Sequence, residues 1–192
     1  MNTPTAQRKA RRTLLAILAV FALPLALAWL FTIGPLNWRP ANSVNYGVLL
    51  QPPLQLQSFG VMDTAATQLD VNAIARDWFV VVLHAARCTE LCQGMLQIAE
   101  RIQIAVGRDK SRITLALLGP QNDSPAPPTQ SWLLPADGKL IQAVSRATGV
   151  PQFDSILLVV DHRGRIILTY PPDEDGQGVL EDLKRLLRAT AR

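Results

Sequence analysis

The sequence predicts an α/β fold, in which a central mixed sheet with flanking helices is preceded by one transmembrane helix. A long uncharged segment near the N-terminus predicts the transmembrane helix. After it, apolar runs of strand length alternate with amphipathic helical patterns, which predicts a layered sheet-and-helix domain. Near the C-terminus two strand-like runs flank a short turn, which adds an antiparallel hairpin to the sheet.

The N-terminal segment has the features of a membrane anchor. Residues 13–33 carry no charged side chain, and a helix needs about 20 such residues to cross a bilayer core. Residues 1–12 contain bases but no acid, so the positive-inside rule predicts a cytoplasmic basic segment at 1–12 and a transmembrane helix at 13–33. A signal peptide cleaved after Ala28 is the alternative, and it would deliver the same domain to the same compartment.

The charge balance separates this segment from the rest of the chain. The sequence has 19 Lys and Arg against 15 Asp and Glu, a net charge of +4. Four bases in the first twelve residues account for the whole excess: Arg8, Lys9, Arg11 and Arg12. The remainder is neutral, which argues against a nucleic-acid surface. The sequence also shows no Ser/His/Asp set, phosphate-binding glycine loop or zinc-finger spacing, hence no hydrolase or transferase signature.

A linker is predicted at residues 34–46, and residues 47–192 are predicted to form the globular domain. Two short edge strands are expected around Pro52–Pro53, because proline donates no ladder hydrogen bond. Three continuous apolar runs predict strands that are buried on both faces, and a last strand closes the hairpin. The predicted strands are Val48–Leu50, Leu54–Gln57, Trp78–Leu83, Arg112–Leu118, Ser155–Val160 and Arg165–Tyr170.

Three helices are predicted in the same domain. The first follows Trp78–Leu83 and carries an apolar stripe from Leu91 to Ala105. The second spans 137–148, with Asp137 as its N-cap and Gly149 as its stop, and the third carries a leucine stripe from Leu180. Residues 119–131 are polar and proline-rich, so a loop is expected. A β-α-β unit followed by a hairpin and a terminal helix is the thioredoxin arrangement.

The two cysteines, Cys88 and Cys92, stand where the first buried strand leads into the first helix. If both were helical, their Cα atoms would lie roughly 6 Å apart, which permits a disulfide. A helix N-terminus also stabilises a thiolate. Three roles remain open at this point: a structural disulfide, thiol–disulfide exchange and soft-metal binding, for which paired thiolates favour Cu(I).

Two histidines and one proline stand near the predicted site or its hairpin. His84 ends the first buried strand four residues before Cys88, so it can serve as a ligand, as a proton partner or as an ordinary buried residue. His162 lies in the predicted turn between the hairpin strands and is expected to be solvated. Pro151, before the third buried strand, is expected to be an ordinary loop proline with a trans bond.

The strand WFVVVLHAARC, followed by Cys88-x-x-x-Cys92 at the start of a helix, resembles the Sco/SenC family, and the hairpin sequence VVDHRGRI is similar to the family's turn. The family comprises membrane-anchored, thioredoxin-fold proteins of cytochrome c oxidase copper assembly. Two positions depart from its pattern. Gln93 replaces the proline after the second cysteine, and Phe153 stands where counting back from Asp161 places the family's histidine ligand.

This resemblance implies a single-pass protein of the bacterial inner membrane, with its N-terminus in the cytoplasm and a periplasmic thioredoxin-like domain at 47–192. It implies thiol-redox or copper handling in cytochrome c oxidase biogenesis, with an oxidase subunit or assembly factors as partners and without nucleic acid. Cys88 and Cys92 would be the redox pair, with Cys88 as the more exposed, attacking thiol at the helix start and Cys92 as the resolving partner. Cys88, Cys92 and His84 would be the ligands if copper(I) is bound, with no other cofactor. The alternative is a non-catalytic accessory or scaffold subunit with a structural Cys88–Cys92 disulfide.

Overall fold

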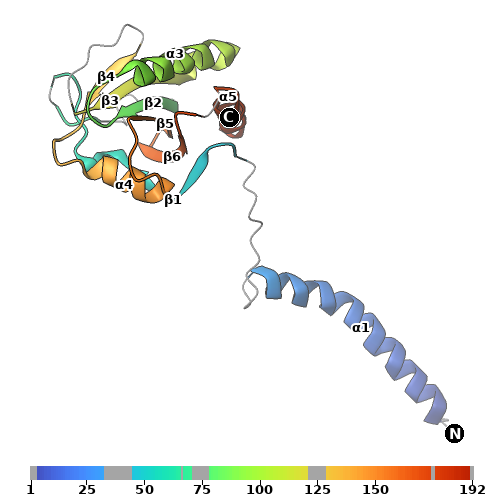
Figure 1. The fold of residues 1–192 in the computed structure, drawn as a ribbon. Helices are drawn as coiled ribbons and strands as arrows, with labels where there is room; N and C mark the ends of the chain where they lie inside the picture. Colours follow the sequence, from blue (N-terminus) through green and yellow to red (C-terminus); the bar gives the residue numbers. More distant parts are fainter. Residues whose placement is uncertain are drawn as a thin grey trace. The chain divides into compact units, whose positions relative to one another are not determined.

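The computed structural model describes residues 4–32, 45–65, 67–70, 78–120, 129–173 and 176–190 (Figure 1). The chain divides into two compact units, Met1–Ser43 and Val44–Arg192. Most of the predicted linker at 34–46, and most of the loop predicted at 119–131, lie outside the described residues.

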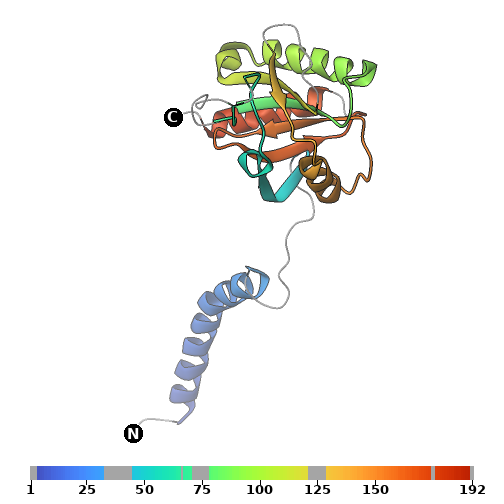
Figure 2. The ribbon, with the colours of Figure 1, turned by 90° about the vertical axis from the view of Figure 1, so that its left-hand side faces the viewer.

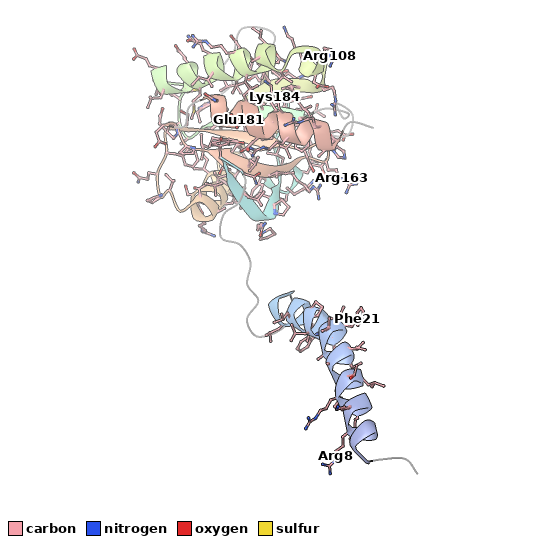
Figure 3. All side chains as sticks on the ribbon, turned by 90° about the vertical axis from the view of Figure 1, so that its right-hand side faces the viewer. Arg8, Phe21, Arg108, Arg163, Glu181 and Lys184 are labelled. Carbon is pink, nitrogen blue, oxygen red and sulfur yellow. A yellow bond between two sulfur atoms is a disulfide. The ribbon has the colours of Figure 1, made fainter. Side chains whose placement is uncertain are left out.

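The first unit contains one helix, α1, which spans Pro4–Thr32 and includes Pro24. Arg8 lies near its N-terminal end and Phe21 farther along it (Figure 3). Large apolar side chains are exposed along the helix, among them Leu25 at 72%. Among the described residues, no helix is both long and apolar enough to count as a membrane span. The transmembrane helix predicted at 13–33 is therefore not confirmed: the chain forms a single helix that also takes in most of the basic segment.

The second unit is built on a six-stranded sheet with the order β1-β6-β5-β2-β3-β4. Its strands are β1 Val48–Gln55, β2 Trp78–His84, β3 Ile113–Gly119, β4 Gln130–Leu133, β5 Ser155–Val160 and β6 Arg165–Tyr170. The β2–β3 and β3–β4 pairs are parallel, whereas β5 pairs antiparallel with both β2 and β6, and β6 pairs antiparallel with β1. The predicted mixed sheet and its hairpin are confirmed.

The strands predicted at the two edges of the sheet were wrong. One continuous strand, β1, replaces the two short strands expected around Pro52–Pro53, and Leu56–Phe59 form a 3-10 helix. At the sheet edge, a register shift between Leu49 and Leu54 accommodates the prolines. The sequence interpretation also missed β4, because it placed Gln130 and Ser131 in a loop. Both residues pair with β3, and the neighbouring Trp132 is buried there.

Helices cover both faces of the sheet (Figure 2). On one face, α3 (Glu90–Ala105) and α5 (Gly176–Ala189) pack over the side chains of Trp78, Val80 and Val82. On the other face, α4 (Lys139–Thr148) packs over Phe79, Val81 and Leu83. Because successive residues of β2 point to opposite faces, this one strand contributes to both cores. The continuous apolar run in its sequence is explained by this double burial.

The ends of α4 differ in part from the prediction. Gly149 ends the helix in the left-handed region, at φ 72°, as expected. At the start, Gly138 is the N-cap at φ 61°, in place of Asp137. The Asp137 carboxylate still accepts the Lys139 N–H at 3.2 Å. The Asp137 side chain therefore accepts an N–H group of the first helical turn from the position before the N-cap.

A buried carboxylate joins the last helix to the first residues of the domain. Asp182 of α5 is 1% exposed. Its Oδ2 accepts the N–H groups of Tyr46 (2.8 Å) and Gly47 (3.0 Å) and the Tyr170 hydroxyl (3.0 Å). Its Oδ1 lies 3.4 Å from an Arg185 nitrogen. Glu181 and Lys184 lie on the same helix (Figure 3). The chain entering the domain is thus fixed to the C-terminal helix.

Candidate functional site

The two cysteines form a disulfide between the end of β2 and the start of α3. Their Cα atoms are 5.1 Å apart, within the range that permits the bond. Only Cys92 is helical, because α3 begins at Glu90 and Thr89 is its N-cap, with extended backbone angles. The condition that both cysteines are helical is therefore not met, because Cys88 precedes the cap.

The two sulfur-bearing residues differ in their access to solvent. Cys92 is fully buried in the core between α3 and the sheet. Cys88 is half-buried and packs at the edge of this core. Of the two, only Cys88 offers a side chain that a partner molecule can reach. The chain thus presents one accessible half of a disulfide and one protected half.

Charges on both sides of Cys88 are exposed and of opposite sign. Arg87 precedes it, and Glu90 is the acid in the first turn of α3. The first turn of a helix leaves backbone N–H groups without intrahelical acceptors, which favours negative charge nearby. When the disulfide is reduced, this end of α3 is therefore suited to stabilise a thiolate on Cys88.

His84 occupies the last position of β2 and is fully buried. By strand alternation it points to the same face of the sheet as Val82, which is the α3 face that also buries Cys92. Its ring lies over Gly119, where an added Cβ atom would overlap the imidazole. On its other side, its register partner is Ser155 of β5. A glycine at position 119 is therefore what makes room for the ring.

The ligand set that the sequence suggested is not assembled. Within the described ranges, no group of three or more His, Cys, Asp and Glu side chains is placed to hold a metal ion. The two sulfurs are bonded to each other. His162 lies in the hairpin turn and is exposed, as expected for a turn residue. The described residues of the oxidised protein thus show no assembled metal site, and Cys88, Cys92 and His84 as copper ligands stay a prediction.

Asp154, which the sequence interpretation did not select, touches the disulfide loop directly. Its carboxylate accepts a short hydrogen bond from the Thr89 hydroxyl, and its carbonyl accepts the Ala85 N–H at 2.9 Å. The segment before β5 thereby runs beside the loop that carries Cys88. The sequence did hold a signal for Asp154, because counting back from Asp161 leads to Phe153, its direct neighbour.

The bond before Pro151 is trans, as expected, since the one cis peptide in the described residues is Gln51–Pro52.

The hairpin turn has a structural role in this arrangement. Asp161 is 2% exposed and accepts the N–H groups of Arg163 and Arg165, each at 2.9 Å. The Arg165 guanidinium pairs with the same carboxylate at 2.6 Å. Gly164, at φ 73°, completes the turn. The Asp-x-x-Gly pattern is accounted for by the turn itself.

Comparison with known families agrees with this geometry. Residues 78–190 match the model of the transmembrane-like, thioredoxin-like family, C-terminal domain. The chain belongs to this family. The match runs from the start of β2 to the end of α5, so it includes the disulfide loop, Asp154 and the hairpin. No curated protein is similar in sequence.

Solved structures show the same fold, and Sco proteins are among them, as the sequence resemblance predicted. Copper-bound yeast Sco1 aligns with a TM-score of 0.52 at 11% identity, covering 78% of this chain and 97% of Sco1. A second yeast Sco1 structure aligns at 0.51 and 13% identity, covering 74% and 97%. The apo form of Trgpx aligns at 0.51 and 12% identity, covering 70% and 96%. The likenesses establish a thioredoxin-like α/β fold.

Proposed function

We propose that this protein carries out thiol–disulfide exchange through Cys88 and Cys92, as a membrane-associated factor in cytochrome c oxidase biogenesis. The observation that supports it most is the unequal burial of the pair at a helix N-terminus. A half-buried sulfur can meet a partner, while the buried one is held ready to resolve the intermediate. The role in oxidase biogenesis rests on the Sco-like fold.

The reaction is a two-step exchange with a protein disulfide as the oxidant. The Cys88 thiolate attacks one sulfur of the partner's disulfide, and the partner's second sulfur leaves as a thiolate. The Cys92 thiol then loses its proton to solvent or to a nearby base, and its thiolate attacks the Cys88 sulfur. The Cys88–Cys92 disulfide re-forms, and the partner leaves as a dithiol. Two electrons have passed from this chain to the partner.

The first test traps the intermediate on the cysteine that reacts first. The reduced full chain carrying Cys92→Ser is mixed with oxidised glutathione, and the adduct is located by mass spectrometry. We expect a stable glutathione adduct on Cys88. The matched Cys88→Ser chain should react far more slowly, because Cys92 is buried. Equal adduct formation in the two variants would contradict the assigned order of attack.

A static disulfide in an accessory or scaffold subunit is the competing function. It predicts that cells producing a chain with both cysteines changed to serine still assemble active oxidase. Exchange predicts that oxidase activity in those cells falls toward that of cells lacking the protein. The disulfide closes so short a loop that its stabilising effect alone is a weak reason for the pair.

Copper handling receives less support than exchange. Yeast Sco1 was crystallised with copper bound, but the described side chains here do not assemble a third ligand beside the sulfurs. We therefore assign no copper ligands in this chain. Titration of the reduced full chain with Cu(I), with Cys88→Ser as the control, tests this. Stoichiometric binding that the control lacks would show that Cys88 binds Cu(I) and would support copper as the cargo of this chain.

We also propose that α1 holds the domain at a membrane, on its oxidising, periplasmic side. The support is the exposure of large apolar side chains along the helix, including Leu14 at 66% and Phe21 at 70%, since exposed apolar surface is driven out of water. Cell fractionation tests it. The full chain should sediment with membranes after a carbonate wash, and a chain starting at Val44 should not.

A further inference from the structure

The N-cap of α3 does not make the hydrogen bond that its residue type usually makes. A threonine at this position ordinarily accepts an N–H group from the second or third helical residue, here Leu91 or Cys92. In the described structure the Thr89 side chain makes no capping bond. Its hydroxyl donates to Asp154 Oδ2 instead. The N–H groups of the first turn are therefore left to other acceptors.

Asp154 is held beside the loop by its backbone as well as by its side chain. Its carbonyl accepts the Ala85 N–H at 2.9 Å, and the next residue, Ser155, pairs with His84 in the β5–β2 ladder. These contacts do not involve the carboxylate. The Asp154 side chain can thus be changed while the main chain that carries it stays in place.

We propose that Asp154 is a positioning residue that keeps the Thr89 hydroxyl away from the N-terminus of α3. The first-turn N–H groups then stay available to the Cys88 thiolate in the reduced protein. The inference rests on the proposed exchange function and deepens it. Without the carboxylate, the Thr89 hydroxyl turns toward the helix and competes with the thiolate for the same donors.

The charge of Asp154 acts in the opposite direction. A carboxylate near Cys88 disfavours a thiolate there, as Glu90 does, while Arg87 favours it. Replacing Asp154 by asparagine removes the charge but keeps an oxygen that accepts the Thr89 hydroxyl. Replacing it by alanine removes both. The two variants therefore separate the effect of charge from the effect of positioning.

The experiment measures alkylation of Cys88 by iodoacetamide in the reduced full chain at neutral pH, with mass spectrometry of the Cys88 peptide. Because the thiolate is the reactive form, we expect Asp154→Ala to react about fivefold more slowly than Asp154→Asn, which also lacks the charge, and this is the size of a lost N-cap interaction. Asp154→Asn should react at the natural rate or faster. Equilibration with glutathione gives a second measurement, in which Asp154→Ala should favour the disulfide by about fivefold relative to Asp154→Asn.

Thr89→Ala provides the deciding control, because an alanine has no hydroxyl to turn toward the helix. In that background, Asp154→Ala should no longer slow the alkylation. The same slowing relative to Asp154→Asn in both backgrounds, or alkylation of the single Asp154→Ala variant as fast as that of Asp154→Asn, would overturn the proposal. Alkylation needs no partner disulfide. A chain that fails to exchange with partners can therefore still pass this test, and the two hypotheses fail separately.

Discussion

Asp182 and Asp154 each join two distant parts of the domain, but the two carboxylates do so in different surroundings. Asp182 is 1% exposed, and two backbone N–H groups, a tyrosine hydroxyl and an arginine surround it. Asp154 is only partly buried, and its side chain accepts from the exposed Thr89. A buried carboxylate with several donors holds a single arrangement. An accessible one with a single side-chain partner can be altered at little cost.

This difference separates stability from reactivity. Asp182 lies on α5, where it holds the entry of the chain into the domain. Asp154 lies beside the loop that carries Cys88. Substitutions at Asp182 should therefore change the free energy of unfolding, and substitutions at Asp154 should change the chemistry of the disulfide. The following predictions test that division, from the largest expected effect to the smallest.

Asp182→Ala should cause the largest loss of stability. It leaves the buried Gly47 N–H group, the buried Tyr170 hydroxyl and the partly buried Tyr46 N–H group without their acceptor, and each buried group costs about 1–3 kcal/mol. We expect the free energy of unfolding to fall by roughly 3 kcal/mol or more, measured by urea denaturation. Asp182→Asn, which keeps one acceptor oxygen, should lose less. Equal stability of Asp182→Ala and the natural chain would refute the role of this contact.

Reduction of the disulfide should have a smaller effect on stability. A loop closed between residues four apart in sequence contributes about 2 kcal/mol in the chain-entropy treatment. The free energy of unfolding of the reduced chain should therefore fall by that amount or less, again by urea denaturation. A loss as large as that from Asp182→Ala would instead assign the cysteine pair a mainly structural role.

Gly119→Ala tests the packing around His84. The added methyl group overlaps the imidazole, and overpacking of this kind costs about 1–3 kcal/mol. Gly94→Ala is the matched control, because no atom lies within 4 Å of the added Cβ and alanine is favoured over glycine inside a helix. Unfolding measurements should show Gly119→Ala less stable, and Gly94→Ala slightly more stable, than the natural chain. A stable Gly119→Ala chain would show that the ring is not confined there.

The smallest effect is expected at the exposed start of α4. The side-chain hydrogen bond from Lys139, followed by its backbone N–H group, lowers the pKa of Asp137. A lowered folded-state pKa means that the pair adds stability above the unfolded-state pKa and loses it as pH falls through the folded-state pKa. Asp137→Asn should slightly reduce the drop in thermal midpoint between neutral and acidic pH. A larger drop in this variant would show that folding raises the pKa of Asp137 and does not lower it.

The sequence was sufficient for those parts of the fold that depend on periodicity. The apolar runs at β2, β3 and β5 and the stripes of α3 and α5 all correspond to observed elements. Local chemistry was a weaker guide at element ends. Thr89 and Gly138 are the N-caps where Cys88 and Asp137 were expected to begin helices. The sequence also could not show that the Thr89 hydroxyl bonds Asp154 in place of its own helix.

Contacts between distant residues could not be deduced from one sequence. Asp154 and Thr89 are 65 residues apart, and Tyr46 and Asp182 are 136 apart. A single contact between residues so far apart produces no periodic pattern in the sequence. The strand β4 was missed for a similar reason, because its pairing with β3 determines it more than its short, partly polar sequence does. The position of the cysteines and the greater exposure of Cys88 could be predicted, whereas the complete burial of Cys92 required the packing of α3 on the sheet.

The reduction potential of the Cys88–Cys92 pair tests the proposed exchange most directly. The full chain is equilibrated with glutathione mixtures, and the oxidised fraction is measured after acid quenching. Structural disulfides have potentials below about −300 mV, and exchange-active ones lie above it. We predict a value above about −300 mV, within the range in which glutathione reduces the pair. A value below about −300 mV would contradict the account and identify the bond as structural.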